Sequence, residues 1–160
     1  MDISFKTDEG RFNYRVAGII IHNNKLLIMK DERSPYYYIP GGRVAINELS
    51  EDAIVREIRE ELNADVKVNR MLWVNENFFH EERLGEKFHE ICFYYLLDII
   101  DDKLLNEDNE FMRKDTENQN LTFCWKDLNK IKDLNIYPLL VKNNILALPQ
   151  AIEHVVEMKI

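Results

Sequence analysis

Cysteine, glycine and positive charge are all scarce in this chain of 160 residues. The two cysteines, Cys92 and Cys124, stand alone in apolar stretches without a CxxC spacing, which argues against a zinc site and predicts buried free thiols in a reducing compartment. With 21 basic against 29 acidic residues the net charge is −8, so a long nucleic acid is not an expected partner. Hard divalent cations are the more natural partners of such a chain.

Long hydrophobic runs are also missing. The longest, ICFYYLL, is far too short to cross a membrane, and the first residues, MDISFKTDEGRF, lack the apolar segment of a signal peptide. No linker rich in Pro, Gly or Ser divides the sequence, and 46% of its residues are hydrophobic. We therefore expect one globular domain over residues 1–160, located in the cytoplasm and without a membrane partner.

The hydrophobic patterns predict a mixed α/β protein with antiparallel sheet and few crossover helices. Neither a GxGxxG nor a GxxxxGK[ST] phosphate loop is present. The polar segment 101–120 is expected to be irregular and is long enough to suggest a lid or binding loop. Expected strands cover 14–21 and 25–30 as a hairpin turning at His22-Asn23-Asn24, then 36–40, 65–79 and 87–99 as an antiparallel pair, and 121–125; expected helices cover the stretch from an N-cap at Ser50 to Leu62, then 126–131 and 139–158.

The stretch REIREEL places three carboxylates on one side of the first helix. Glu60 and Glu61 lie three and four residues after Glu57, so all three face the same region, beside an apolar stripe spaced four residues apart. At an effective dielectric near 20, each ionised pair repels by about 3 kcal/mol. The plain interpretation is a solvated helix face, and the functional one is a grip for a divalent cation.

Two of the five glycines are adjacent, at Gly41-Gly42, directly after Pro40. A glycine pair between a strand and an acidic helix indicates that the backbone takes a positive φ or passes close to a ligand. An ordinary tight turn is the alternative.

These pieces together resemble the Nudix box, GX5EX7REUXEEXGU with U aliphatic. The matching residues are Gly42, Glu48, Arg56-Glu57-Ile58 and Glu60-Glu61, and the box covers residues 42–64. The resemblance implies a Nudix fold, an α/β/α sandwich around a mixed, largely antiparallel sheet. It also implies hydrolysis of a nucleoside diphosphate linked to another group, a small-molecule substrate, with Mg²⁺ or Mn²⁺.

By the same resemblance, Glu57, Glu60 and Glu61 coordinate the metal or position the attacking water, and the Gly41 carbonyl adds a ligand. Arg56 is better assigned to a charge-assisted bond with Glu48 that fixes the loop to the helix.

This chain departs from the family pattern at four positions. Asn63 stands where the box has glycine, and since asparagine tolerates the left-handed conformation that ends a helix, the backbone role is expected to survive. The final aliphatic position holds the small Ala64. Ala45 and Asn47 stand where many members carry Glu and Gly, which leaves the loop geometry open.

The general base is not identified by the box. Glu90 interrupts an apolar strand on the same side as Cys92 and is a candidate accessory ligand or base, with a strand-end charge as the alternative. Glu117 is a second candidate from the polar loop, whereas His89 faces away from Glu90. Candidate stacking partners for a base are Tyr36, Tyr37, Tyr38, Trp73, Phe78, Phe79 and Trp125.

Three rival functions share the fold. An RNA 5′-end pyrophosphohydrolase is disfavoured by the acidic balance, and a non-catalytic nucleotide sensor is disfavoured because every box glutamate is present. A diphosphate isomerase would need a catalytic cysteine near the metal, for which Cys92 is the candidate. The base, the linked group and the choice between monomer and homodimer stay open.

Overall fold

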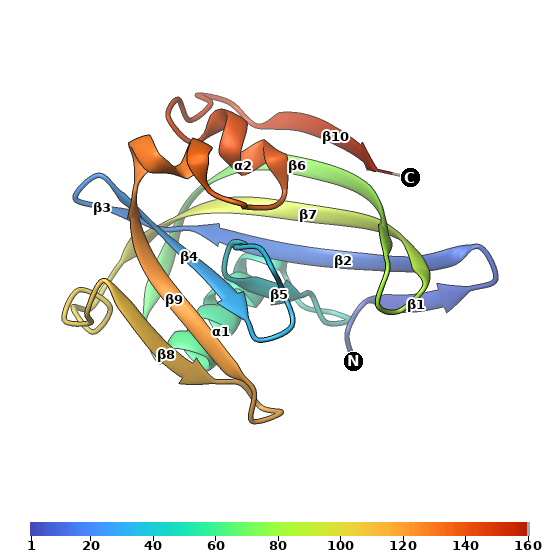
Figure 1. The fold of residues 1–160 in the computed structure, drawn as a ribbon, viewed down its shortest axis with the longest axis horizontal. Helices are drawn as coiled ribbons and strands as arrows, with labels where there is room; N and C mark the ends of the chain where they lie inside the picture. Colours follow the sequence, from blue (N-terminus) through green and yellow to red (C-terminus); the bar gives the residue numbers. More distant parts are fainter. Residues whose placement is uncertain (160) are drawn as a thin grey trace.

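Two β-sheets and three short helical segments make up the computed structural model, which describes residues 1–159 (Figure 1). One sheet has the strand order β1-β2-β7-β6-β10, with β5 also pairing with β2, and the other has the order β3-β4-β9-β8. The first sheet contains β1 Ser4–Thr7, β2 Gly10–Ile19, β5 Gly41–Arg43, β6 Val66–Glu81, β7 Glu86–Ile99 and β10 Glu153–Lys159; the second contains β3 Ile21–His22, β4 Lys25–Asp31, β8 Glu110–Lys114 and β9 Asn120–Asp127; the helices are α1 Ser50–Leu62, the 3₁₀ segment η1 Leu128–Asp133 and α2 Leu139–Asn144.

The larger sheet is mixed. Its pairs β2–β7 and β6–β10 are parallel, whereas β1–β2, β2–β5 and β6–β7 are antiparallel. One face packs against α1 through Val16, Tyr95 and Ile58, and the other packs against the second sheet, η1 and α2 through Cys92, Ile28 and Val141. This layered arrangement confirms the predicted α/β class and mixed sheet, with the strands divided between two hydrogen-bonded sheets.

Several local predictions are confirmed. Strands β6 and β7 form the expected long antiparallel pair, and Asn23 and Asn24 have φ of 49° and 61° in the predicted turn. Asn63 has φ 49° and ψ 39°, and its N–H bonds the Arg59 carbonyl at 2.9 Å, so the helix ends as expected. Asn47, with φ 65°, likewise takes a left-handed conformation at the loop position where glycine is usual.

The hairpin prediction was only partly right. The run 14–21 divides, because β2 joins the larger sheet while β3 pairs with β4 in the smaller one. The predicted strand over 36–40 is replaced by isolated bridges at Tyr37 and Tyr38. Ser50 is the first residue of α1 and not its N-cap: Leu49 takes that place, without a side-chain cap.

The long C-terminal helix predicted over 139–158 is wrong. Helix α2 ends at Asn144, and β10 instead runs parallel to β6. Pro149 stands between the two elements, and the β-branched pair Val155-Val156 suits a strand paired with a long neighbour better than a helix. The segment 101–120 is also more regular than predicted, because it contains β8, which pairs with β9.

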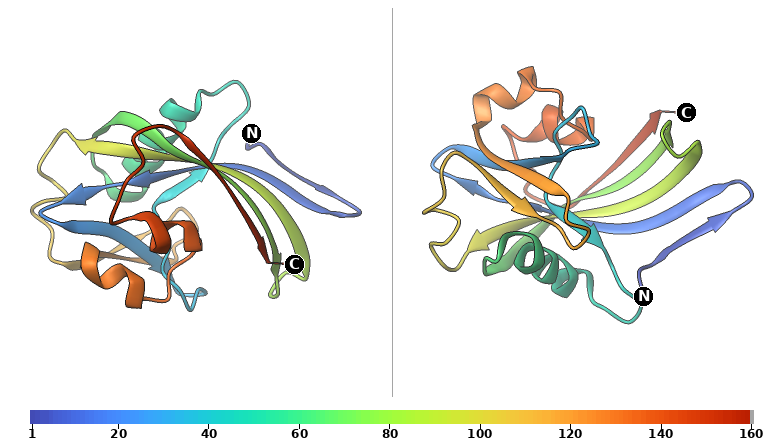
Figure 2. Two further views of the ribbon diagram at one scale, coloured as in Figure 1. Left: turned by 90° about the horizontal axis from the view of Figure 1, so that it is seen from above. Right: turned by 60° about the horizontal axis from the view of Figure 1, so that its bottom comes forward.

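The larger sheet extends beyond the smaller one at the end formed by β1 and the β6–β7 turn (Figure 2). We call its face toward the second sheet the inner face, which carries Ala17, Trp73, Cys92 and Tyr94. Side chains alternate between faces along a strand, so Arg15, Asn75, Asn77, Glu90 and Glu157 lie on the inner face too. No helix within residues 1–159 is long and apolar enough to cross a membrane.

Candidate active site

Arg56 joins the loop before α1 to the helix. Its Nε and Nη2 donate to the two Glu48 carboxylate oxygens at 2.6 and 3.0 Å, and Glu48 also accepts the Ala45 N–H at 2.8 Å. A further bond runs from Nη2 to the Arg43 carbonyl at 3.1 Å. The Arg56 hydrogen bond holds the pKa of Glu48 below its usual value. The predicted Arg56–Glu48 bond is confirmed.

The same guanidinium also reaches the box glutamates. Arg56 Nη1 lies 2.8 Å from Glu57 Oε1 and 3.3 Å from Glu60 Oε2. This offsets part of the repulsion between the carboxylates while leaving their other oxygens available. Arg56 therefore holds the loop against the helix through Glu48, and it also contacts Glu57 and Glu60.

Strand β5 passes directly beneath Glu57. A Cβ added to Gly42 would lie 2.2 Å from the Glu57 carboxyl carbon, and one added to Gly41 would lie 2.1 Å from the Val16 carbonyl oxygen. Neither glycine has a positive φ among the residues described, so that explanation of the pair is wrong. Both glycines are explained by close approach: a Cβ on Gly42 would displace the end of the Glu57 side chain, and one on Gly41 would meet the backbone of β2.

The three glutamates differ in exposure. The Glu60 side chain is 54% exposed and that of Glu57 only 15%. Burial raises the pKa of Glu57, against the opposing effect of Arg56. Burial, followed by the charge of Glu57, raises the pKa of Glu61 to about 8. The Oε2 atom of Glu61 is buried without a hydrogen-bond partner, which is costly for a carboxylate.

These residues fit a divalent cation by chemistry. Buried carboxylate oxygens that lack a protein partner and repel one another are the hard ligands that Mg²⁺ and Mn²⁺ prefer. Within residues 1–159, no group of three or more His, Cys, Asp or Glu side chains is already arranged with metal-binding geometry. Gly41 lies in β5 beside this cluster, as the predicted carbonyl ligand requires.

Arg15 is a site residue that the sequence analysis missed. It pairs with Arg43 of β5 and with Cys92 of β7, on the inner face. Burial alone would lower its pKa, but Glu90 and, after it, Cys92, Tyr94 and Glu61 outweigh that effect and raise it. A cation is thus placed between the box glutamates and Glu90. The only signal in the sequence was a charged residue opening the run RVAGIII.

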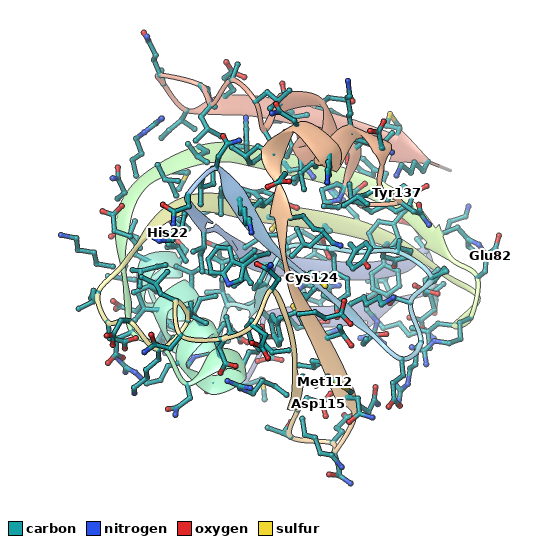
Figure 3. The ribbon with its side chains drawn as sticks, turned by 60° about the vertical axis from the view of Figure 1, so that its left-hand side comes forward. His22, Glu82, Met112, Asp115, Cys124 and Tyr137 are labelled. Carbon is teal, nitrogen blue, oxygen red and sulfur yellow. The ribbon has the colours of Figure 1, made fainter. Side chains whose placement is uncertain are left out.

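The candidates for the general base lie in different parts of the structure. Glu90 lies on the inner face, where its Oε2 accepts from Asn13 Nδ2 at 3.5 Å, as the alternation predicted. His89 faces away and stacks on Phe78 at 4.3 Å between ring centroids. Glu117 is exposed in the β8–β9 turn. Asp115, which lies at the tip of that hairpin in Figure 3, is the loop acid whose charge contributes to the raised pKa of Glu61.

Both cysteines are free and buried, as predicted. Burial, followed by the charge of Glu90, raises the pKa of the Cys92 thiol, so it is protonated at neutral pH. A protonated, buried thiol is poorly suited to the isomerase alternative.

The aromatic candidates separate into core and surface. Trp73 and Trp125 are buried, and Phe79 stacks on Phe88 at 5.0 Å. Tyr36 is different, because it contacts Tyr137 edge-on at 5.1 Å and Tyr38 at 6.5 Å. Burial raises the pKa of Tyr36, as does the charge of Glu81. Tyr137 was not among the predicted residues.

Comparisons with known proteins bear on the family and the fold of the chain. The family model described as "NUDIX domain" matches residues 13–140. An ADP-ribose pyrophosphatase of Methanocaldococcus jannaschii is 35% identical over 92 residues, which are 56% of this chain and 52% of that protein. The chain therefore matches about half the length of this curated relative.

Solved structures share the fold at low sequence identity. An ADP-ribose pyrophosphatase from Streptococcus suis is 14% identical, with a TM-score of 0.55 over 90% of this chain and 98% of that one. A MutT protein from Bacillus halodurans is 13% identical, with a TM-score of 0.61 over 92% and 90%. With the box residues in place and most of the sequence matched by one family model, this chain belongs to the NUDIX domain family.

Proposed function

We propose that the protein hydrolyses a diphosphate bond in a nucleoside diphosphate linked to another group, and that it requires Mg²⁺ or Mn²⁺. The observation that carries the proposal is Glu61 Oε2, a buried carboxylate oxygen without a partner, beside a Glu57 carboxylate pressed against Gly42. A monovalent counterion in solvent does not explain a buried carboxylate oxygen without a partner. A divalent cation coordinated by these carboxylate oxygens does.

Each residue has a distinct role in this proposal. Glu57, Glu60 and Glu61 hold the cation, and the Gly41 carbonyl is a further ligand. A bound Mg²⁺ or Mn²⁺ would neutralise the charge that grows on the diphosphate oxygens as water attacks phosphorus. Arg56 and Glu48 position Glu57 and the loop through their paired hydrogen bonds.

The inner face supplies the remaining groups. Arg15 lies next to the glutamates and is suited to orient a phosphate, because its planar fork matches phosphate oxygens. Glu90, on the same face, is an accessory base or ligand. The substrate is a small molecule such as a nucleotide or nucleotide sugar, and the buried free thiols suit a reducing cytoplasm.

The test is a hydrolysis assay on a panel containing ADP-ribose, nucleotide sugars and nucleoside triphosphates. The products are separated and quantified by ion-exchange chromatography, which detects each cleavage with or without EDTA present. We expect turnover of at least one compound with Mg²⁺ or Mn²⁺ and none with EDTA. Glu61→Gln should lose about 10²-fold or more. The matched control is Glu51→Gln, an exposed carboxylate on the first turn of the same helix. Full activity of Glu61→Gln would overturn the assignment.

A further inference from the structure

A row of polar side chains crosses the inner face of the larger sheet. Asn13 of β2 is in register with Glu90 of β7, Glu90 with Asn77 of β6, and Asn77 with Glu157 of β10. We call these four residues the polar row. Asn75 lies two residues before Asn77, so it belongs to the same face one step closer to the second sheet.

Oxygen atoms of this region are buried without partners. They are Asn75 Oδ1, Asn77 Oδ1 and Glu157 Oε2, and the whole Asn75 residue is only 1% exposed. Buried polar atoms are nearly always hydrogen-bonded in folded proteins, since an unmade bond is costly. Trp73 Nε1, two residues before Asn75 on the same face, is a buried donor without a partner as well. Three unpartnered acceptors on adjacent strands, beside one such donor, indicate that something absent from the protein itself supplies hydrogen-bond partners there.

Aromatic rings lie beside the outer end of the row. Lys159, two residues after Glu157, is 3.7 Å from the centre of the Tyr137 ring, and Tyr137 in turn meets Tyr36. Glu157 Oε1 accepts the Leu140 N–H at 2.7 Å, which fixes the carboxylate and leaves Oε2 as the free oxygen. Figure 3 shows Tyr137 over the end of the larger sheet. A flat ligand would find stacking surface here as well as acceptors.

The row is a suitable distance from the catalytic glutamates. Starting at β5, where Gly42 touches Glu57, the sheet continues through β2, β7 and β6 to β10. At about 4.8 Å between neighbouring strands, these four steps span roughly 19 Å. An extended nucleoside diphosphate has a similar length. A base at β6 and β10 would therefore leave its diphosphate near Arg15 and the box glutamates.

We propose that Asn75, Asn77 and Glu157 form the subsite for the nucleobase of the substrate, and that they select a base carrying an amino group. The inference rests on the proposed function, since it takes the ligand to be a nucleotide. The three unpartnered oxygens are acceptors, and a carboxylate oxygen such as Glu157 Oε2 only accepts, so they pair with the N–H groups of an exocyclic amine. A base that presents a carbonyl oxygen at the same place leaves those acceptors unpaired, and sites of that kind reject the wrong ligand strongly.

The test compares binding of nucleoside monophosphates by calorimetry, which requires no turnover. AMP and IMP differ by an amino group replaced with a carbonyl oxygen, together with a hydrogen gained on the adjacent ring nitrogen, and CMP and UMP differ in the same way. We expect AMP to bind at least 10-fold more tightly than IMP, or CMP than UMP. Glu157→Gln, which adds a donor in nearly the same shape, should reduce that preference to about 3-fold or less. Asn77→Ala should weaken binding of the amino compound.

The matched control is Glu153→Gln, the same change on the same strand at an exposed residue in register with Trp73. It should keep the wild-type preference. Equal binding within both pairs, no binding of any monophosphate, or an unchanged preference in Glu157→Gln would each overturn the inference. Hydrolysis of the substrate panel separates the two proposals: turnover without base preference removes only the subsite, and base preference without turnover removes only the hydrolase assignment.

Discussion

Buried polar groups are paired differently in two regions of the molecule. These regions are the corner where α1 meets β5 and the polar row on the inner face. At the corner, Arg56 bonds Glu48, Glu57 and Glu60, so most of the charges have partners within the protein. In and beside the row, Asn77 and Asn75 each leave an oxygen unpaired. Paired polar groups stabilise a fold, whereas unpaired ones destabilise it and are retained where a ligand completes them.

Glu61 is the exception within the corner, because its buried Oε2 has no partner there. In this respect it resembles the row and not its neighbours on the helix. The two regions together therefore contain two groups of buried oxygens without partners in the protein: Glu61 Oε2 at the proposed cation site, and the acceptors of the proposed base subsite. Substitutions in each region test this difference.

The largest effect is expected from Gly42→Ala. Its new methyl group would overlap the Glu57 carboxylate, which is the flexible end of a side chain, so the fold should survive while the carboxylate is displaced. Hydrolysis should fall by about 10²-fold in the same product assay. Gly41→Ala is the contrast, because its methyl group meets the Val16 backbone oxygen and should reduce stability as well. Normal turnover by Gly42→Ala would mean that Glu57 is not held where catalysis needs it.

Arg56→Lys tests how much the hydrogen bonds of Arg56 stabilise the corner where α1 meets β5. Lysine keeps the charge but loses the planar fork, so the two bonds to Glu48 and the bond to the Arg43 carbonyl cannot all form. The free energy of unfolding should fall by about 2 kcal/mol even without substrate or metal. Urea denaturation in EDTA measures it. If activity were lost at unchanged stability, Arg56 would serve the substrate and not the loop.

The raised pKa of Glu61 predicts a pH dependence of the metal-free protein. Between the ordinary value of 4.5 and the folded value of about 8, the folded state retains a proton that the unfolded chain has lost. Stability should therefore fall as pH rises through this window and level off above it, with a slope of up to about 1.4 kcal/mol per pH unit. Denaturation in EDTA at several pH values should show that slope in the wild type and a smaller one in Glu61→Gln. Equal slopes would contradict the assignment.

Asn75→Leu tests the unpaired side of the comparison and should have the smallest effect on stability. Replacing an unsatisfied buried amide with an apolar side chain of similar shape should leave the free energy of unfolding unchanged or raise it by about 1 kcal/mol. Nucleotide binding should weaken at the same time. A loss of stability as large as that of Arg56→Lys would show that Asn75 has protein partners after all.

The same two regions explain what the sequence could and could not reveal. The residues of the corner lie within 24 positions of one another, between Gly41 and Ala64, and helical periodicity fixes how Glu57 and Glu61 share a face. Their identity, the Arg56–Glu48 bond and the helix end at Asn63 were therefore predictable.

The polar row joins residues from four strands, from Asn13 to Glu157, and depends on registers that no local pattern encodes. Glu157 was assigned to a helix, because the apolar spacing of 139–158 also suits helical periodicity. Only the parallel pairing of β10 with β6 brings it beside Asn77. Tertiary pairing overrode the local preference at that point.

The most direct test of the cation site is the melting temperature of the wild type and of Glu61→Gln, each with EDTA and with saturating Mg²⁺. A cation that binds only the folded protein raises its stability by mass action, by about 2.7 kcal/mol at 100 times the dissociation constant. The wild type should melt at a clearly higher temperature with Mg²⁺. Glu61→Gln should be as stable as the wild type, or more so, in EDTA, and should gain little from the metal. No shift in the wild type, or the same shift in both proteins, would contradict the claim that these glutamates exist to hold a divalent cation.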